Sequence, residues 1–91
     1  MNFEISKAFV KDVESLPGHA KKIILSVIDD IHSAKNPHEI NDCSKLRGIN
    51  DLYRIRRGNY RITFEYFESS AVLKRALPRG KIYKKQNLPH K

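Results

Sequence analysis

The strongest constraint on the fold is the dipeptide Gly58-Asn59 in the middle of residues 52–66. Gly and Asn tolerate the positive φ angles of a two-residue hairpin loop, and alternating apolar and polar runs flank them on both sides. The stretch therefore predicts a β-hairpin. In a hairpin with this loop, Arg56 lies directly opposite Arg61.

Successive side chains of a strand point to opposite faces of the sheet, so the hairpin predicts two different faces. The residues of the apolar face, which we expect in the core, are Tyr53, Ile55, Tyr60, Ile62 and Phe64. The residues of the polar and mostly cationic face are Arg54, Arg56, Arg61, Thr63 and Glu65. Two like charges directly opposite each other destabilise a sheet. An anion bound between Arg56 and Arg61 would explain the pair.

The charge of the chain is strongly segregated. Residues 1–51 carry seven Lys and Arg against eight Asp and Glu, a net charge of −1. Residues 52–91 carry eleven against two, a net charge of +9. This distribution predicts a polyanion or an acidic protein as the partner.

Two helices are expected in the N-terminal half. After a short strand at residues 2–6, apolar residues at helical spacing predict a helix that Pro17-Gly18 ends. Residues 19–34 carry one continuous apolar stripe, which predicts a second amphipathic helix. Ser6 is the expected N-cap of the first helix.

The remaining segments complete the predicted sheet. Residues 36–51 show no periodicity and predict a loop. Residues 71–77 predict a last strand, whose poor alternation is typical of a strand buried on both faces. We therefore expect one α+β domain over residues 1–91, with two N-terminal helices packed on one face of a mostly antiparallel four-stranded sheet and an open basic face.

Several other classes of protein are disfavoured. No run approaches the ~18 apolar residues of a membrane helix, and the N-terminus lacks the pattern of a secretory signal. A single cysteine, Cys43, forms no internal disulfide, which suits a reducing cytoplasm. His19, His32 and His38 have no metal-ligand spacing with Cys43, so we expect neither a metal nor a cofactor.

Several short motifs together resemble the RelE/ParE superfamily of bacterial toxins. They are Lys-Leu-Arg-Gly at 45–48, Tyr-Arg-Ile-Arg at 53–56, Gly-Asn-Tyr-Arg-Ile at 58–62, and Arg79 followed by Tyr83. The order of the predicted elements also matches, so the resemblance covers nearly the whole chain. It implies the toxin of a type II toxin-antitoxin system, neutralised by a cognate antitoxin. The RelE branch implies ribosome-dependent cleavage of messenger RNA, whereas the ParE branch implies inhibition of DNA gyrase without nuclease activity.

The RelE branch also implies roles for particular residues. Arg61, Arg79 and Tyr83 fall on its catalytic positions, where guanidinium groups would stabilise the charge of the transition state. Tyr83 would either stack on a base or orient the nucleophile. The residues that fall on RNA-binding positions or lie near them are Arg54, Arg56, Lys45, Arg47, Lys81 and Lys84.

One departure from the RelE pattern concerns the general base. Some members have a lysine where this chain has Arg56, and arginine holds its proton too strongly to act as a base. Several groups remain open for this role, namely Lys81, Lys84, Lys85, His90, Tyr83 or a group of the ribosome. The histidine that often precedes the tail arginine in the superfamily is Pro78 here.

The predicted function is that of a cytoplasmic endoribonuclease toxin. Its expected partners are messenger RNA, the ribosome and an acidic segment of an antitoxin, with no membrane. A ParE-like gyrase inhibitor is the alternative, and an RNA-binding domain without catalysis is a third. Arginines on the exposed face of a sheet are also common as plain solvated surface.

Overall fold

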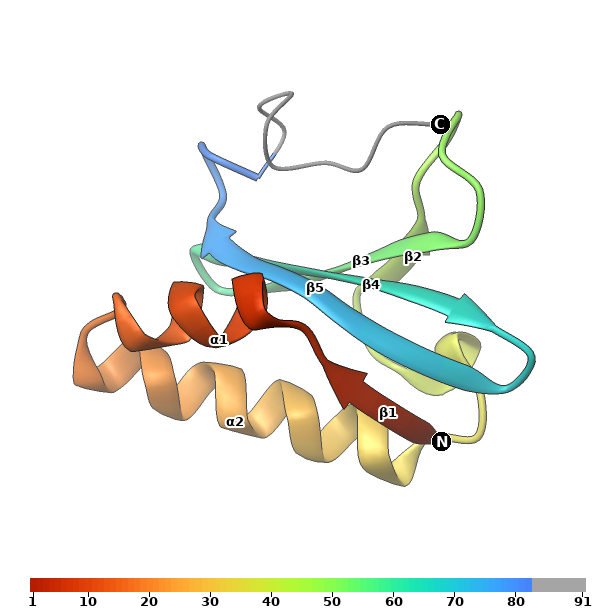
Figure 1. The fold of residues 1–91 in the computed structure, drawn as a ribbon. Coiled ribbons are helices and arrows are strands. Elements are labelled where there is room, and N and C mark those ends of the chain that lie inside the picture. Colours follow the sequence, from red (N-terminus) through yellow and green to blue (C-terminus); the bar gives the residue numbers. More distant parts are fainter. Residues whose placement is uncertain (83–91) are drawn as a thin grey trace.

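The computed structural model describes residues 1–82, in which two helices and a 3₁₀ turn accompany a five-stranded mixed sheet (Figure 1). The strands run in the order β1-β5-β4-β3-β2 across the sheet. Along the chain, the elements are β1 Asn2–Ile5, α1 Lys7–Glu14, α2 Gly18–Ser33, the 3₁₀ turn η1 Pro37–Glu39, β2 Cys43–Lys45, β3 Leu52–Arg57, β4 Tyr60–Phe67 and β5 Ser70–Pro78. The predicted α+β class with two N-terminal helices is confirmed.

The prediction of four strands is wrong, because Cys43–Lys45 form an additional edge strand, β2. These residues lie inside the stretch 36–51 that the sequence predicts as a loop. β2 pairs antiparallel with β3, with Ser44 opposite Arg54. A strand of three residues is too short to show alternation, so its pairing with β3 decides its conformation. At the other edge β1 runs parallel to β5, while the remaining pairings are antiparallel.

The predicted hairpin is confirmed. β3 and β4 pair antiparallel around Gly58-Asn59, and Arg56 lies opposite Arg61. Of the two loop residues only Gly58 has a positive φ, 57°, which is the pattern of a type II′ turn with Gly at its first central position. This turn fixes the register, and the register fixes which side chains share a face.

The helix-side core lies between α2 and the sheet. Its buried residues from the helices are Phe9, Ile24, Val27 and Ile31, and those from the strands are Ile55, Ile62, Phe64, Ala71, Leu73 and Ala76. Fully burying one large apolar side chain stabilises a fold by about 1.5 to 3 kcal/mol, so this core dominates the stability. Arg57 adds a polar tie, since it donates to Asp30 of α2 at 2.6 Å and to Ser26 at 3.1 Å.

α1 lies along the outer edge of β5. It covers the part of this edge that follows the residues paired with β1. Ser6 is the N-cap of α1, as predicted, because its hydroxyl accepts a hydrogen bond from the Phe9 amide. Ser6 also donates from its backbone to Leu73 O and from its hydroxyl to Lys74 O. Asp12 of α1 then accepts a hydrogen bond from the amide of Ala76 at 3.0 Å. The helix thus pairs edge groups of β5 that β1 is too short to reach.

β5 alternates poorly because of an irregularity in its pairing with β4. The register shifts between Thr63 and Phe64, as in a β-bulge. On β5 the shift brings both Leu73 and Ala76 into the helix-side core, although they lie three positions apart and regular alternation would put them on opposite faces. The interruption of the alternation, attributed above to burial on both faces, therefore coincides with this bulge. Within residues 1–82, no helix is both long enough and apolar enough to cross a membrane.

Candidate nucleic-acid interface

The arginines of the hairpin lie on the face of the sheet opposite the helices. Tyr53 and Ile55 pack with the helix-side core, so Arg54 and Arg56 point away from it. On β4, Arg61 lies opposite Arg56 and therefore shares its face. We call this surface, formed by Arg54, Arg56 and Arg61, the basic face.

The facing arginines at the end of the hairpin each have a partner within the protein. Arg61 donates from Nη1 to the carbonyl oxygens of Gly58 and Tyr60, each at 2.9 Å. Arg56 lies 3.8 Å from a carboxylate oxygen of Asp42, and both side chains are more than half exposed. An exposed ion pair of this kind contributes little and breaks readily. The Arg56 guanidinium can therefore turn toward a bound anion at small cost.

Arg54 lies further along the basic face, and its guanidinium donates to the hydroxyl of Ser44 on β2 at 2.9 Å. Lys45, by contrast, is in register with Tyr53, whose side chain packs against the helix-side core. The structure therefore places the exposed Lys45 on the other face of the sheet, away from the arginines. Arg47 is exposed in the loop that follows β2.

Arg79 comes close to Arg61 through the hairpin loop. Its backbone amide donates to the carbonyl of Asn59 at 2.9 Å, directly beside the carbonyls that hold Arg61. The exposed Lys81 follows in a turn closed by its amide and Pro78 O. Tyr83 and Lys84, together with the base candidates Lys85 and His90, lie outside the described residues.

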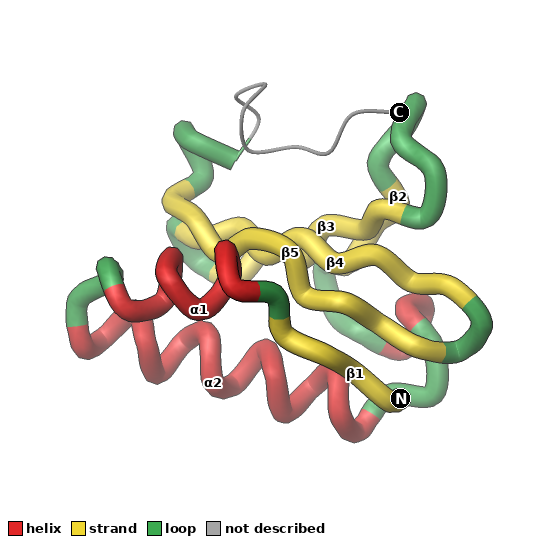
Figure 2. Tube along the Cα trace, in the orientation of Figure 1, coloured by secondary structure: helices red, strands yellow, loops and turns green. Residues whose placement is uncertain are grey.

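The expectation of an open basic face is wrong in part. Leu52, Thr63 and Ile82 are fully buried but do not belong to the helix-side core. Residues 46–51 and 79–82 both rise from the sheet on the side away from the helices (Figure 2). Alternation predicted that Thr63 shares the face of the arginines, but burial on that face depends on segments distant in sequence, which periodicity does not reveal.

Cys43 is not a reactive nucleophile in this environment. Its side chain is half-buried at the start of β2, and burial raises the pKa of the thiol from 9.0 to about 11, although the nearby Arg54 opposes the shift. The thiol therefore stays protonated at neutral pH. Within residues 1–82, no three side chains of His, Cys, Asp or Glu gather as metal ligands do.

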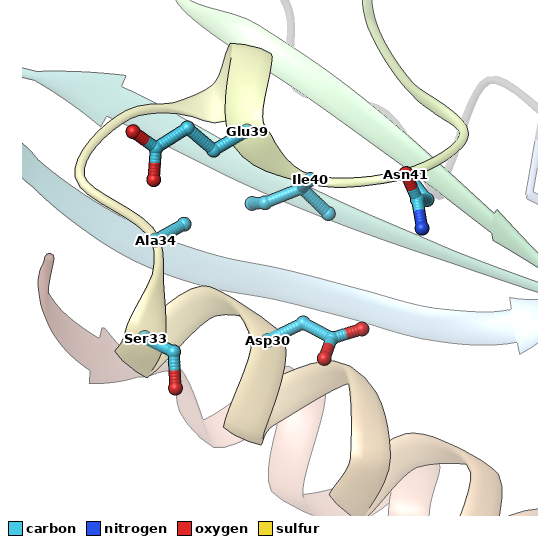
Figure 3. Close-up of a pocket in the computed structure, with 6 residues that line it drawn as sticks. All are labelled: Asp30, Ser33, Ala34, Glu39, Ile40 and Asn41. Carbon is cyan, nitrogen blue, oxygen red and sulfur yellow. The ribbon is translucent and has the colours of Figure 1, made fainter.

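A polar pocket of about 210 Å³ lies between the end of α2 and the η1 segment (Figure 3). Its lining residues are Asp30, Ser33, Ala34, Glu39, Ile40 and Asn41. Asp30 is engaged by Arg57, and Glu39 accepts a hydrogen bond from the amide of Lys35 at 2.9 Å. With two carboxylates and no basic side chain in its lining, this pocket disfavours anions, so the basic face is the candidate site.

Known proteins resemble this chain over almost its full length. The toxin RelE3 of Methanocaldococcus jannaschii is 36% identical over 84 residues, which cover 91% of this chain and 96% of that protein. The chain belongs to the RelE toxin family. This membership confirms the resemblance found in the sequence and favours its RelE branch.

Solved structures agree with this assignment. A chain in the crystal structure of a RelB-RelE antitoxin-toxin complex from Methanococcus jannaschii matches with a TM-score of 0.77 and 34% identity, covering 94% of this chain and 99% of that one. A chain of the archaeal RelE-RelB complex from Pyrococcus horikoshii matches with a TM-score of 0.70 and 31% identity, covering 88% and 96%. No protein-family model matches the chain.

Proposed function

We propose that this member of the RelE family is an endoribonuclease that cleaves messenger RNA at the ribosome. The observation that carries the proposal is the meeting of Arg61 and Arg79 at one loop, where three consecutive carbonyls, from Gly58 to Tyr60, accept their hydrogen bonds. Arg54 and Arg56 extend the positive charge along β3. Such a row of guanidinium groups suits the phosphates of a single strand.

The proposed reaction is attack of a ribose 2′-hydroxyl on the neighbouring phosphodiester. The new bond joins the 2′-oxygen to phosphorus, and the bond to the 5′-oxygen of the next nucleotide breaks. The products are a 2′,3′-cyclic phosphate and a 5′-hydroxyl end, which takes up a proton. Negative charge grows on the phosphoryl oxygens in the transition state, where Arg61 and Arg79 would stabilise it.

The proton of the 2′-hydroxyl needs an acceptor, and Arg56 cannot serve because it remains protonated at physiological pH. Among the described residues the candidate base is Lys81. The other candidates lie outside the described residues and are Tyr83, Lys84, Lys85, His90 and a group of the ribosome. We therefore propose that catalysis depends mainly on charge stabilisation and on orientation of the RNA. A ribosome that holds the messenger in place would supply much of that orientation.

We further propose that an antitoxin with an acidic segment restrains the chain in the cytoplasm. The support is that relatives at 34% and 31% identity have been solved as complexes with RelB antitoxins. The net charge of +9 on residues 52–91 would otherwise hold the protein on RNA nonspecifically. An acidic segment over the basic face would remove that attraction.

Primer extension on messenger RNA from cells that briefly express the chain tests the proposed activity. Cuts within translated codons are expected, and they should disappear when translation initiation is blocked. Intact message together with accumulated gyrase–DNA complexes would contradict the proposal and support the ParE-like alternative. Intact message with tight RNA binding would indicate a binding domain without catalysis.

A further inference from the structure

Thr63 carries a buried hydroxyl that the proposed site does not yet use. Its neighbours on β4, Ile62 and Phe64, belong to the helix-side core, so the Thr63 side chain points to the basic face. The residue has no exposed area, and its Oγ1 finds no hydrogen-bond partner among residues 1–82. Buried hydroxyls in folded proteins are almost always paired, so this one requires an explanation.

Arginines lie next to Thr63 on both neighbouring strands. Arg54 is in register with it on β3, and Arg75 is in register with it on β5. Arg61 lies two residues earlier on the same strand and the same face. The guanidinium groups donate instead to Ser44, to Asp12 and to the carbonyls of the hairpin loop. An anion with several acceptor oxygens could engage the hydroxyl and the guanidinium groups together.

The strand pairing next to Thr63 is also irregular. The register between β4 and β5 shifts immediately after this residue. Bulges of this kind are over-represented beside functional sites, where they re-aim a side chain. The extra residue is Lys74 on β5, so the bulge borders Thr63 without changing the direction of its side chain.

We propose that the Thr63 hydroxyl donates a hydrogen bond to a phosphate oxygen of RNA bound on the basic face. The proposal rests on the RNA-cleaving function proposed above. Because Thr63 has no exposed area in this structure, the groups that cover this part of the basic face must move aside before a phosphate can reach the hydroxyl. In the free protein the unpaired hydroxyl lowers the stability of the fold. In the complex its hydrogen bond to the phosphate raises the affinity for RNA.

Two substitutions separate this role from a structural one. Thr63→Val keeps the shape of the side chain and removes the hydroxyl, whereas Thr63→Ser keeps the hydroxyl. Loss of an unpaired buried hydroxyl should raise the melting temperature of the valine variant by about 4 to 8 °C. Loss of a hydrogen bond to a charged phosphate should lower its single-turnover cleavage on programmed ribosomes by about 10- to 100-fold. The serine variant should cleave within a few-fold of wild type.

A binding measurement tests the proposed contact between the Thr63 hydroxyl and RNA without relying on cleavage. A single-stranded oligoribonucleotide should raise the melting temperature of wild type and Thr63→Ser more than that of Thr63→Val, with Arg54→Ala as a second weakened variant. An equal RNA-induced rise in wild type and Thr63→Val would overturn the inference, as would a valine variant that melts below wild type. A wild-type chain that binds RNA but leaves it uncut would refute the proposed nuclease activity, and the binding comparison would still decide the role of Thr63.

Discussion

Guanidinium groups give the basic face a charge that does not vary over the physiological range of pH, because arginine loses its proton only above about pH 12. Arg61 and Arg79 are joined to the same loop, one by its side chain and the other by its backbone amide. Their common anchor limits how far apart the two groups can lie. In the proposed reaction, donors that the fold already gathers at one loop would need only side-chain rotation to reach the transition state.

Replacing Arg61 or Arg79 with alanine should lower the single-turnover rate of cleavage on programmed ribosomes by about 10² to 10³-fold, as with removal of one oxyanion donor. Arg54→Ala should mainly weaken RNA binding, since a contact of equal strength before and during the reaction leaves the chemical step unchanged. Lys21→Ala removes one charge from an exposed position of α2 and serves as the control. Wild-type rates in both Arg61→Ala and Arg79→Ala, with folding intact by circular dichroism, would refute the catalytic assignment.

Cys43 offers a test of the environment at the start of β2. Its pKa is raised from 9.0 to about 11 by burial, so its thiolate is about 100-fold scarcer at pH 8 in the folded chain than in the unfolded one. Alkylation by iodoacetamide should be slower in the native protein than in urea by at least that factor. Because the folded chain holds this proton more tightly than the unfolded chain, the thiol contributes to the free energy of unfolding. The contribution is fully present below pH 9 and should be lost as the pH rises toward 11. Equal alkylation rates in both states would show that the thiol is not shielded.

At the scale of elements, one carboxylate joins α1 to the outer edge of β5 beyond the reach of β1. Asp12 accepts hydrogen bonds from Nε of Arg75 at 2.7 Å, from Nη2 of the same side chain at 2.9 Å, and from the amide of Ala76. The hydrogen bond to Asp12 is also the main reason that the pKa of Arg75 is raised. α1 is thereby fixed against the strand that leads to Arg79.

Asp12→Ala should therefore reduce the free energy of unfolding in urea by about 1.5 to 3 kcal/mol, because it removes a largely buried acceptor of charge-assisted hydrogen bonds. Asp12→Asn keeps one acceptor oxygen and should lose less. The matched control is Asp29→Ala on the exposed side of α2, where a change within about 0.5 kcal/mol is expected. Similar losses in the Asp12 and Asp29 variants would mean that α1 does not secure the edge.

How much of this arrangement the sequence predicts depends on the range of the interactions involved. The hairpin and its two faces follow from alternation around Gly58-Asn59, and both signals are local. β2 escapes prediction because only its pairing with β3 makes it a strand. The approach of Arg79 to the hairpin loop rests on a hydrogen bond to Asn59, twenty residues earlier, which no local pattern encodes.

At the scale of the whole molecule, positive charge is concentrated in the part of the chain that forms the hairpin and β5. These segments build the middle of the sheet, while the nearly neutral first half supplies the helices that cover its other face (Figure 1). Of these charges, those of Arg54, Arg56 and Arg61 lie on the side away from the helices. Such asymmetry orients an approaching polyanion before any contact forms.

Binding to a single-stranded oligoribonucleotide should accordingly weaken steeply with salt. If Arg54, Arg56, Arg61 and Arg79 each neutralise one phosphate, the logarithm of the affinity should fall against the logarithm of the salt concentration with a slope of about −3. Arg56→Ala should reduce the slope by about 0.7, since one fewer counterion contact is released. An affinity that does not change between low and high salt would exclude the basic face as the binding surface.

The parallel pairing of β1 with β5 has a consequence for how the protein folds. Asn2 pairs with Ser70 and Ile5 with Leu73, so the strand partner of β1 comes from the far end of the described chain. Closing so large a loop costs entropy before any contact compensates for it, which slows folding. The helices consequently have no complete surface to pack on until β5 is in place. Arg79, which directly follows β5, therefore reaches the hairpin loop only when this strand is in place.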